Sequence, residues 1–197
     1  SVYYSLIFQI IYNERIIMNA DIFFTVWLSE YKFFESFFQV ISTRLFSFSL
    51  LFLFSIYFFF KKKFLVFVFI ILAILIGDFL GALLKEILSE ERPCFGSNGE
   101  FLVSEGILES LCGNQKTGMP SNHALNFFLF TSLFFLIERD LLITSILILV
   151  SILVGLSRVF LIKHFLSQVI IGTALGLIFG VLFYEIYKRI IKKWTFQ

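Results

Sequence analysis

Five long stretches of the sequence are almost free of charged residues and of turn-forming residues. They are Leu45–Phe60, Phe64–Leu84, Ser121–Ile137, Leu141–Ser157 and Phe165–Tyr184. Each is 16 to 21 residues long, close to the roughly 20 residues with which a helix crosses the hydrocarbon of a bilayer. The strands of a membrane barrel would instead alternate polar and apolar residues. The pattern therefore predicts an all-α fold, a polytopic transmembrane helical bundle with five clear spans.

The first 43 residues follow a different pattern. From Asp21 to Thr43, polar residues recur every three or four positions, which places them in one stripe along a helix. Such a helix suits the membrane interface better than a full span. Residues 1–20 are apolar but are interrupted by Glu14 and Arg15, so they are either interfacial or a weak sixth span.

These patterns divide the chain into two parts. Residues 1–43 are predicted to be an N-terminal amphipathic, interfacial segment. Residues 44–197 are predicted to be the transmembrane core, with a long outward-facing loop at residues 89–119.

The composition supports a membrane protein. Hydrophobic residues make up 59% of the 197 residues and charged residues 15%, against roughly 45–50% and 25% in soluble domains. A soluble domain of this size keeps much of its surface exposed and could not hide so much apolar area. The composition also excludes a disordered tail, a nucleic-acid-binding arm and a small disulfide-rich domain.

The positions of the basic residues predict the orientation. Three groups flank the predicted spans: Lys61, Lys62 and Lys63; Arg139; and Lys188, Arg189, Lys192 and Lys193. Five crossings place all three groups on the same side of the membrane. Cytoplasmic loops are enriched in Lys and Arg, so this side and the C-terminus are predicted to be cytoplasmic.

The scarce chemically reactive residues gather at the opposite, outward ends of the spans. They are His123, His164, Lys85, Arg92 and Arg158. Three cations can neutralise the charge on a phosphoryl group during its transfer. Of two imidazoles, one can attack phosphorus while the other protonates the leaving oxygen. The set predicts a site for phosphoryl chemistry on the outward face.

Pro120 adds an anion-binding element to this face. Proline is favoured in the first turn of a helix, and the helix that begins here would direct the N–H groups of Ser121, Asn122 and His123 outward. Free N–H groups at a helix N-terminus bind anions. This helix end is therefore a candidate part of the same site.

Three motifs contain these residues. They are Lys85-x6-Arg92-Pro93, Pro120-Ser121-Asn122-His123 and Ser157-Arg158-x5-His164-x3-Gln168. Their order and spacing resemble the three signatures of the type-2 phosphatidic acid phosphatase superfamily. The resemblance covers at least residues 85–168, and it implies a helical bundle of membrane lipid phosphatases that act without a metal or another cofactor.

The resemblance also implies a role for each motif residue. His164 would be the nucleophile that forms a phosphohistidine, and His123 would protonate the leaving group and then activate water. The phosphate would be bound by Lys85, Arg92, Ser121, Asn122 and Arg158.

Two positions depart from the family pattern. Asn122 stands where glycine is usual, and asparagine tolerates unusual backbone angles better than most residues. Gln168 stands where aspartate is usual. Four residues after His164 on a helix, it faces the same side, so its carbonyl oxygen is predicted to accept a hydrogen bond from the imidazole and fix its tautomer. We therefore expect an active site that includes Gln168 as a catalytic residue.

Three further residues have predicted roles outside the motifs. Asp78 is predicted to make a structural polar contact inside the bundle. Cys94 and Cys112 both lie in the outward loop, where a disulfide is possible in an oxidising compartment. Two positions cannot decide between a disulfide and two free thiols.

The sequence thus predicts a multi-pass protein of the bacterial cytoplasmic (inner) membrane with a periplasmic active site. Its partners would be the bilayer and a phosphorylated lipid, with no nucleic acid; the oligomeric state is not predicted. The first candidate activity is lipid A 1-phosphatase. The alternatives are an undecaprenyl-pyrophosphate or phosphatidylglycerol-phosphate phosphatase, a lipid phosphotransferase and, from a different class, a non-catalytic lipid-binding membrane protein.

Overall fold

The computed structural model describes residues 20–195, with side chains described up to residue 190. Its elements in chain order are α2 (Ala20–Ser29), η1 (Lys32–Phe34), α3 (Glu35–Ile41), α4 (Arg44–Phe60), α5 (Phe64–Leu88), α6 (Gly96–Ser104), α7 (Asn122–Glu138), α8 (Leu141–Phe160) and α9 (Leu166–Thr195). Within the described range the only β pairing is an isolated bridge between Glu91 and Thr117. The predicted all-α class is confirmed.

Each predicted span coincides with a helix, but the count of five spans is not reached. Among the described residues, three helices are long and apolar enough to cross a membrane: α5, α8 and the part of α9 up to Ile190. A fourth is counted if Lys32–Ile41 and α4, which meet at a bend of 54°, form one span. The count is lower because α4 and α7 have only 17 residues each.

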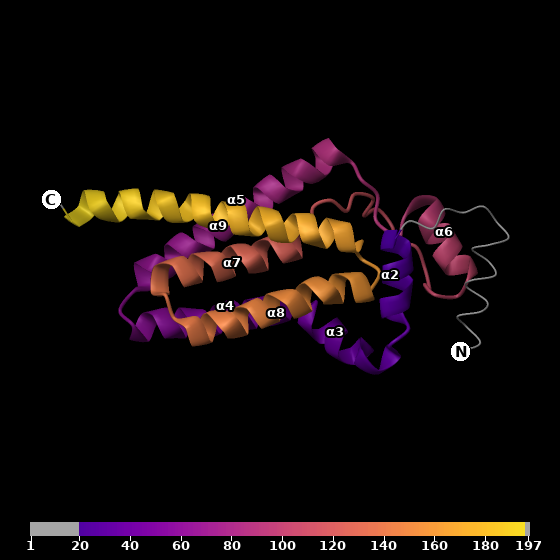
Figure 1. Ribbon diagram of the computed structural model, residues 1–197, viewed down its shortest axis with the longest axis horizontal. Helices are drawn as coiled ribbons and strands as arrows, with labels where there is room; N and C mark the ends of the chain where they lie inside the picture. Colours follow the sequence, from indigo (N-terminus) through magenta and orange to yellow (C-terminus); the bar gives the residue numbers. More distant parts are fainter. Residues whose placement is uncertain (1–19, 196–197) are drawn as a thin grey trace.

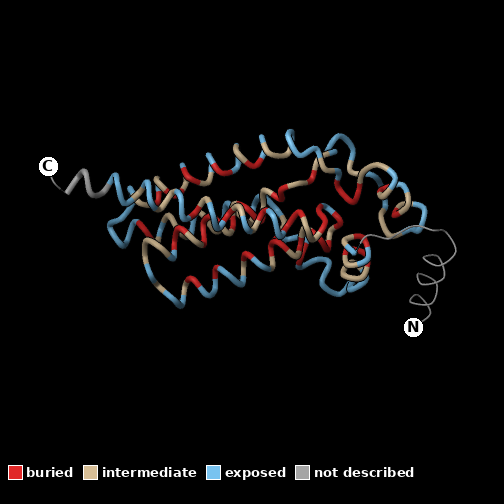
Figure 2. The backbone as a smooth tube through the Cα atoms, turned by 45° about the horizontal axis from the view of Figure 1, so that its top comes forward, coloured by how far each residue is buried: buried red, intermediate tan, exposed pale blue. Residues whose placement is uncertain are grey.

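Helix α7 lies at the centre of the bundle. It packs against α5, α8 and α9, and its side chains Leu125, Leu129 and Leu133 are fully buried. Large apolar side chains such as Leu65 and Leu142 lie exposed on the outside, and Figure 2 shows how buried and exposed residues alternate along the helices. An apolar exterior around a packed interior is what a bundle in hydrocarbon requires.

The two ends of the bundle differ in what they carry (Figure 1). At one end, the Lys63 ammonium lies 2.9 Å from the Glu138 carboxylate and joins the α4–α5 turn to the end of α7. The three groups of basic residues lie at this end, together with the last turns of α9. The long α5–α7 connection and the α8–α9 turn lie at the other end, where the three motifs meet.

The N-terminal segment does not form the single amphipathic helix that the polar stripe predicts. It breaks after Ser29 and again before Arg44, which gives α2, η1 and α3. The stripe also fails to face outward, because Thr25 is buried and Asp21 Oδ1 accepts a hydrogen bond of 3.0 Å from Ser167 N. Asp21 thus satisfies one of the free N–H groups in the first turn of α9, and α2 is held across the end of the bundle.

The prediction for residues 1–20, an interfacial segment or a weak sixth span, falls almost entirely on residues outside the described range. The boundary between residues 1–43 and the transmembrane core stays a prediction.

The predicted outward loop folds back onto the end of the bundle. Its helix α6 inserts Leu102 among Ile22 of α2 and Ile162 and Phe165 of the α8–α9 turn. A disulfide joins Cys94 to Cys112, with the Cα atoms 5.4 Å apart. Loop residues thereby reach the turn that carries His164.

Candidate active site

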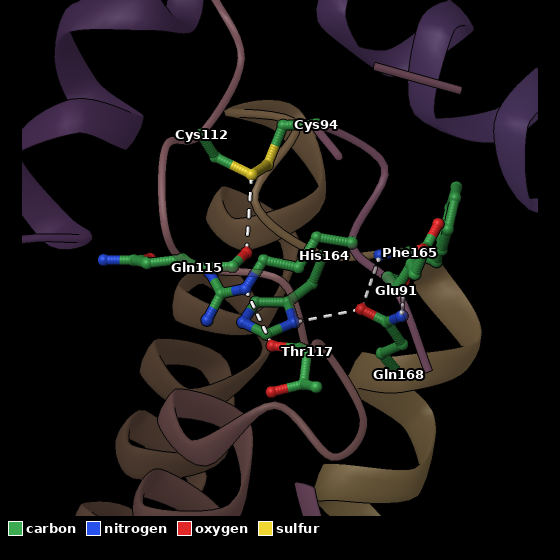
Figure 3. Close-up of a disulfide and its surroundings, with 9 residues drawn as sticks. Glu91, Cys94, Cys112, Gln115, Thr117, His164, Phe165 and Gln168 are labelled. Carbon is green, nitrogen blue, oxygen red and sulfur yellow. Dashed lines mark hydrogen bonds between the residues drawn. A yellow bond between two sulfur atoms is a disulfide. The ribbon is translucent and has the colours of Figure 1, made fainter. Parts of the chain in front are cut away.

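His164 lies in the tight turn between α8 and α9. Its backbone N–H donates to Arg158 O at 3.0 Å, and His164 as a whole is only 2% exposed to solvent. Its Nδ1 lies 3.1 Å from Gln168 Oε1, which also accepts from Phe165 N at 3.3 Å (Figure 3). Because an amide oxygen can only accept, the proton sits on Nδ1. The lone pair of Nε2 is then left for chemistry.

The orientation of the Gln168 amide is set from its other side. Gln168 Nε2 donates to the backbone carbonyl of Glu91 at 2.8 Å and lies 3.5 Å from Glu90 Oε1. Only the nitrogen of the amide can donate to a carbonyl, so Oε1 must face His164. The loop after α5 thereby fixes the tautomer of a histidine that lies more than 70 positions later in the chain.

Gly118 makes room for this arrangement. Its N–H donates to Glu90 O at 2.7 Å, and a Cβ at this position would lie 2.2 Å from Gln168 Oε1. No larger residue could occupy the position without moving the amide. Neither Gly118 nor the Glu91 carbonyl was identified from the sequence. The one signal available was that Gly118 stands two residues before Pro120, at the edge of the second motif.

Arg92 and Ser121 are among the motif residues that carry buried polar atoms without a partner in the described part of the chain. Arg92 donates from Nε to Thr117 O at 2.9 Å, while its Nη1 is buried with no partner. The Ser121 hydroxyl, on a fully buried residue, is also unpartnered. Buried donors are nearly always satisfied in native proteins, so both groups fit an oxyanion that would accept their hydrogen bonds.

Three cations act electrostatically on His164. Burial is the largest cause that lowers the pKa of His164 well below its usual value, and the charges of Arg92, Arg158 and Lys85 lower it further. The hydrogen bond to Gln168 acts in the opposite direction but is the smallest contribution. His164 is therefore neutral at physiological pH, as a nucleophile must be, and the three predicted phosphate-binding cations surround it.

Arg92 and Arg158 are themselves partly withdrawn from solvent. Burial lowers the pKa of the Arg92 guanidinium. Arg158 donates from Nη1 to the Ser42 hydroxyl, and its Nε is buried without a partner in the described part of the chain. Fixed cations with unused donors are suited to a bidentate oxyanion.

The second motif packs directly against the third. Ser121, the residue that precedes α7, donates its N–H to Gln168 O at 3.0 Å. His123 follows in the first turn of α7 and is half-buried. It makes no hydrogen bond to any residue in the described range, and its imidazole lines a cavity of about 440 Å³ that lies among α4, α5 and α7.

The Asn122 side chain is turned away from the candidate phosphate site. Its Nδ2 donates to Asp78 O at 3.1 Å and to Asp78 Oδ1 at 2.9 Å, and Asn126 Nδ2 donates to the same Oδ1 at 2.8 Å. A Cβ on Gly81 would lie 2.8 Å from Asn122 Oδ1, so the small residue permits the contact. The predicted polar contact of Asp78 is present. Any bond from Asn122 to phosphate must come from its backbone.

A metal centre has no obvious ligand set here. In the range that the structure describes, no group of three or more His, Cys, Asp and Glu lies close enough to share an ion.

The fold defines an integral membrane protein, and the site is a candidate oxyanion-binding site built around a buried histidine. The chain belongs to the PAP2 superfamily, whose family model matches residues 66–192. The match spans all three motifs.

Two solved structures resemble most of the chain. One is the crystal structure of the first transmembrane PAP2-type phosphatidylglycerolphosphate phosphatase from Bacillus subtilis; it has a TM-score of 0.67 and 20% identity, and the match covers 96% of this chain and 94% of that one. The other is Aquifex aeolicus LpxE, with a TM-score of 0.61, 19% identity and coverage of 85% and 96%. No curated protein matches the sequence. At these identities the two structures establish the shared fold.

Proposed function

We propose that this protein is a membrane lipid phosphatase that works through a phosphohistidine on His164. The observation that carries the proposal is the buried His164–Gln168 pair beside two unpartnered donors, Arg92 Nη1 and Ser121 Oγ. Membership of the PAP2 superfamily supports it. So does the phosphatidylglycerolphosphate phosphatase of similar fold.

In the first step, His164 Nε2 attacks phosphorus. The new P–N bond forms as the bond to the lipid oxygen breaks in line with it, and His123 donates its proton to that oxygen. Lys85, Arg92 and Arg158 stabilise the equatorial oxygens. The oxygen of Gln168 accepts from Nδ1–H and stabilises the phosphorylated ring without carrying a full charge.

In the second step, water replaces the lipid. His123, now neutral, takes a proton from water as the new P–O bond forms and the P–N bond breaks. Inorganic phosphate leaves, His164 regains its free Nε2 lone pair, and His123 is again protonated. Protons balance over the cycle because one passes from His123 to the lipid and one returns from water.

Lipid A 1-phosphate remains the first candidate substrate. Undecaprenyl pyrophosphate and phosphatidylglycerol phosphate are the alternatives. The site would lie on the periplasmic side of the bacterial inner membrane with the C-terminus in the cytoplasm, since the basic groups gather at the opposite end. A C-terminal fluorescent reporter that fails to fold in the periplasm should fluoresce; a dark fusion with normal expression contradicts this orientation.

The decisive experiment measures phosphate release from detergent-purified protein. The panel holds lipid A, undecaprenyl pyrophosphate, phosphatidylglycerol phosphate and phosphatidic acid, each with EDTA, vanadate and a His164→Ala control. We expect release from at least one lipid, unaffected by EDTA, inhibited by vanadate and absent in the variant. Release from none contradicts the phosphatase, and release that EDTA abolishes contradicts the metal-independent mechanism.

Two other functions give different outcomes. A phosphotransferase would release little phosphate until an alcohol or sugar acceptor is added and would then form a phosphorylated acceptor. A non-catalytic lipid-binding protein would bind the same lipids equally well with and without His164. The buried, neutral His164 favours chemistry over binding, because binding an anion would be served better by a protonated imidazole.

A further inference from the structure

The cavity beside His123 has one polar end and one apolar end. Its volume of about 440 Å³ is within the range of ligand pockets. The polar end is formed by Arg44, Ser47, Asp78, Asn122, His123 and Asn126. The apolar end consists of Phe48, Leu50, Leu51, Ile74, Phe127 and Phe130, which lie further from the outward end along α4, α5 and α7. A lipid can place its backbone in the polar end of the cavity and its acyl or prenyl chains in the apolar end.

The mechanism determines which part of the substrate enters this cavity. Attack by His164 and departure of the lipid oxygen take place on opposite sides of phosphorus, and His123 protonates the departing oxygen. The leaving group therefore lies on the His123 side, where the cavity is. This assignment of the leaving group to the cavity rests on the proposed function.

Polar atoms at the outer end of the cavity are left without partners. Both amides that bond to Asp78 use its Oδ1, so its other carboxylate oxygen has no donor among the described residues. Asp78 is exposed despite its position well inside α5. Arg44 likewise has no hydrogen bond or ion pair within the described range.

The two asparagine oxygens cannot bind the leaving group in this conformation. Asn122 Oδ1 and Asn126 Oδ1 are buried, and they lie near α5, where a Cβ on Gly81 or Gly77 would be 2.8 Å or 4.0 Å away from them. The free oxygen of Asp78 is thus the strongest acceptor that the cavity offers. Covering the Asp78 carboxylate with the hydrocarbon of a lipid alone is unfavourable, because a buried charge needs a partner.

We propose that this polar end selects lipids whose leaving group carries a hydrogen-bond donor beside the phosphate. A glycerol hydroxyl, as in phosphatidylglycerol phosphate, or a sugar amide, as in lipid A, can donate to Asp78. A polyprenyl diphosphate instead places its second phosphate next to a carboxylate, which repels it. Phosphatidic acid has neither the donor nor the second phosphate and serves as the neutral reference.

The test compares kcat/KM for these four lipids in mixed micelles. We expect phosphatidylglycerol phosphate or lipid A to be preferred over undecaprenyl pyrophosphate by about tenfold or more, with phosphatidic acid between them. Whichever of the first two is faster identifies glycerol or sugar as the natural backbone.

Two charge variants should shift the preference in opposite directions. Asp78→Asn is isosteric and can still accept from both asparagines, so the bundle is retained; it should raise the rate on the diphosphate relative to phosphatidic acid by about fivefold. Arg44→Gln removes the positive charge that offsets the Asp78 carboxylate. The rate on the diphosphate relative to phosphatidic acid should therefore fall. Glu109→Gln is the control for Asp78→Asn: it also removes one negative charge, but in the exposed loop. It should leave the ratio of the two rates unaltered.

The outcomes separate this proposal from the proposed function. If no lipid is hydrolysed, or if His164→Ala retains activity, the phosphatase itself is contradicted. If the enzyme is active but undecaprenyl pyrophosphate is as good a substrate as the donor-bearing lipids, the selection is contradicted. The selection is also contradicted if the rate on the diphosphate relative to phosphatidic acid shifts in the same direction in both charge variants, or in neither. Should Asp78→Asn not fold, Arg44→Gln alone still decides the sign.

Discussion

The proposed nucleophile side and the proposed leaving-group side of the site are built differently. Around His164, the ring and the Gln168 amide are buried, and hydrogen bonds to backbone atoms hold the amide in place. Around His123, the imidazole is half-buried and lines a cavity, and the nearby Asp78 and Arg44 retain unused polar atoms. A nucleophile needs one fixed tautomer and direction, whereas a leaving group needs space. We infer that the side around His164 is the rigid part of the site and that the side around His123 adapts to the substrate.

The largest expected effect is the loss of His164. Replacing it with alanine removes the attacking atom, so phosphate release should fall by about 10⁴-fold or more, as for other nucleophiles of covalent catalysis. Circular dichroism should show the helical bundle intact. A variant that keeps a tenth of the activity would place the nucleophile elsewhere.

Gly118→Ala tests how rigid the nucleophile side is. The added methyl group would meet Gln168 Oε1 and move the amide away from Nδ1, so kcat should fall by about 10²-fold while KM changes little. Asn114→Ala, an exposed change in the same loop, is the control. If the glycine variant turns over normally, the amide is not fixed as tightly as the structure indicates.

Substitutions of Gln168 separate its hydrogen bond with His164 from its hydrogen bond with the Glu91 carbonyl. Gln168→Ala should lower turnover by about 10- to 100-fold because the imidazole loses its orienting partner. Gln168→Asp should keep turnover, since the shorter side chain withdraws from the Glu91 carbonyl and supplies a charge for the imidazolium. Gln168→Glu places a carboxylate oxygen against that carbonyl and should resemble alanine. Equal rates in all four proteins would remove the orienting role.

The pH dependence should show the smallest effect. Only the neutral ring attacks, so kcat/KM falls as the pH drops through the pKa of His164. Because burial and the three cations lower that pKa, the acid limb should lie below the value of about 6.5 for an ordinary histidine. Arg92→Gln removes one cation and should move the limb upward. A limb that stays in place would mean that it reports another group.

Much of the fold and the site could be predicted from local sequence. Charge-poor stretches located the helices α4, α5, α7, α8 and α9, and the three motifs located the histidines and the cations. These signals are local, because the length of an apolar run and the spacing within a helix depend on neighbouring residues. Helical spacing also predicted the contact between His164 and Gln168, which is present although His164 lies in the turn before α9.

Other features could not be predicted because they depend on contacts between distant residues. The polar stripe of residues 21–43 predicted a helix at the membrane interface, yet Asp21 bonds to the start of α9. The Glu91 carbonyl and Gly118 matter only once the loop folds back over the bundle. The number of helices long enough to span the membrane differs from the five predicted, because α4 and α7 have only 17 residues each.

The most direct test of the account is to identify the phosphorylated residue. Purified protein should be mixed with a hydrolysed lipid, stopped within milliseconds in alkali, where phosphohistidine survives, and analysed by peptide mass spectrometry. We predict a phosphoryl group on the imidazole of His164, absent in His164→Ala. Rapid turnover with no adduct on His164, or an adduct on His123 instead, would contradict it.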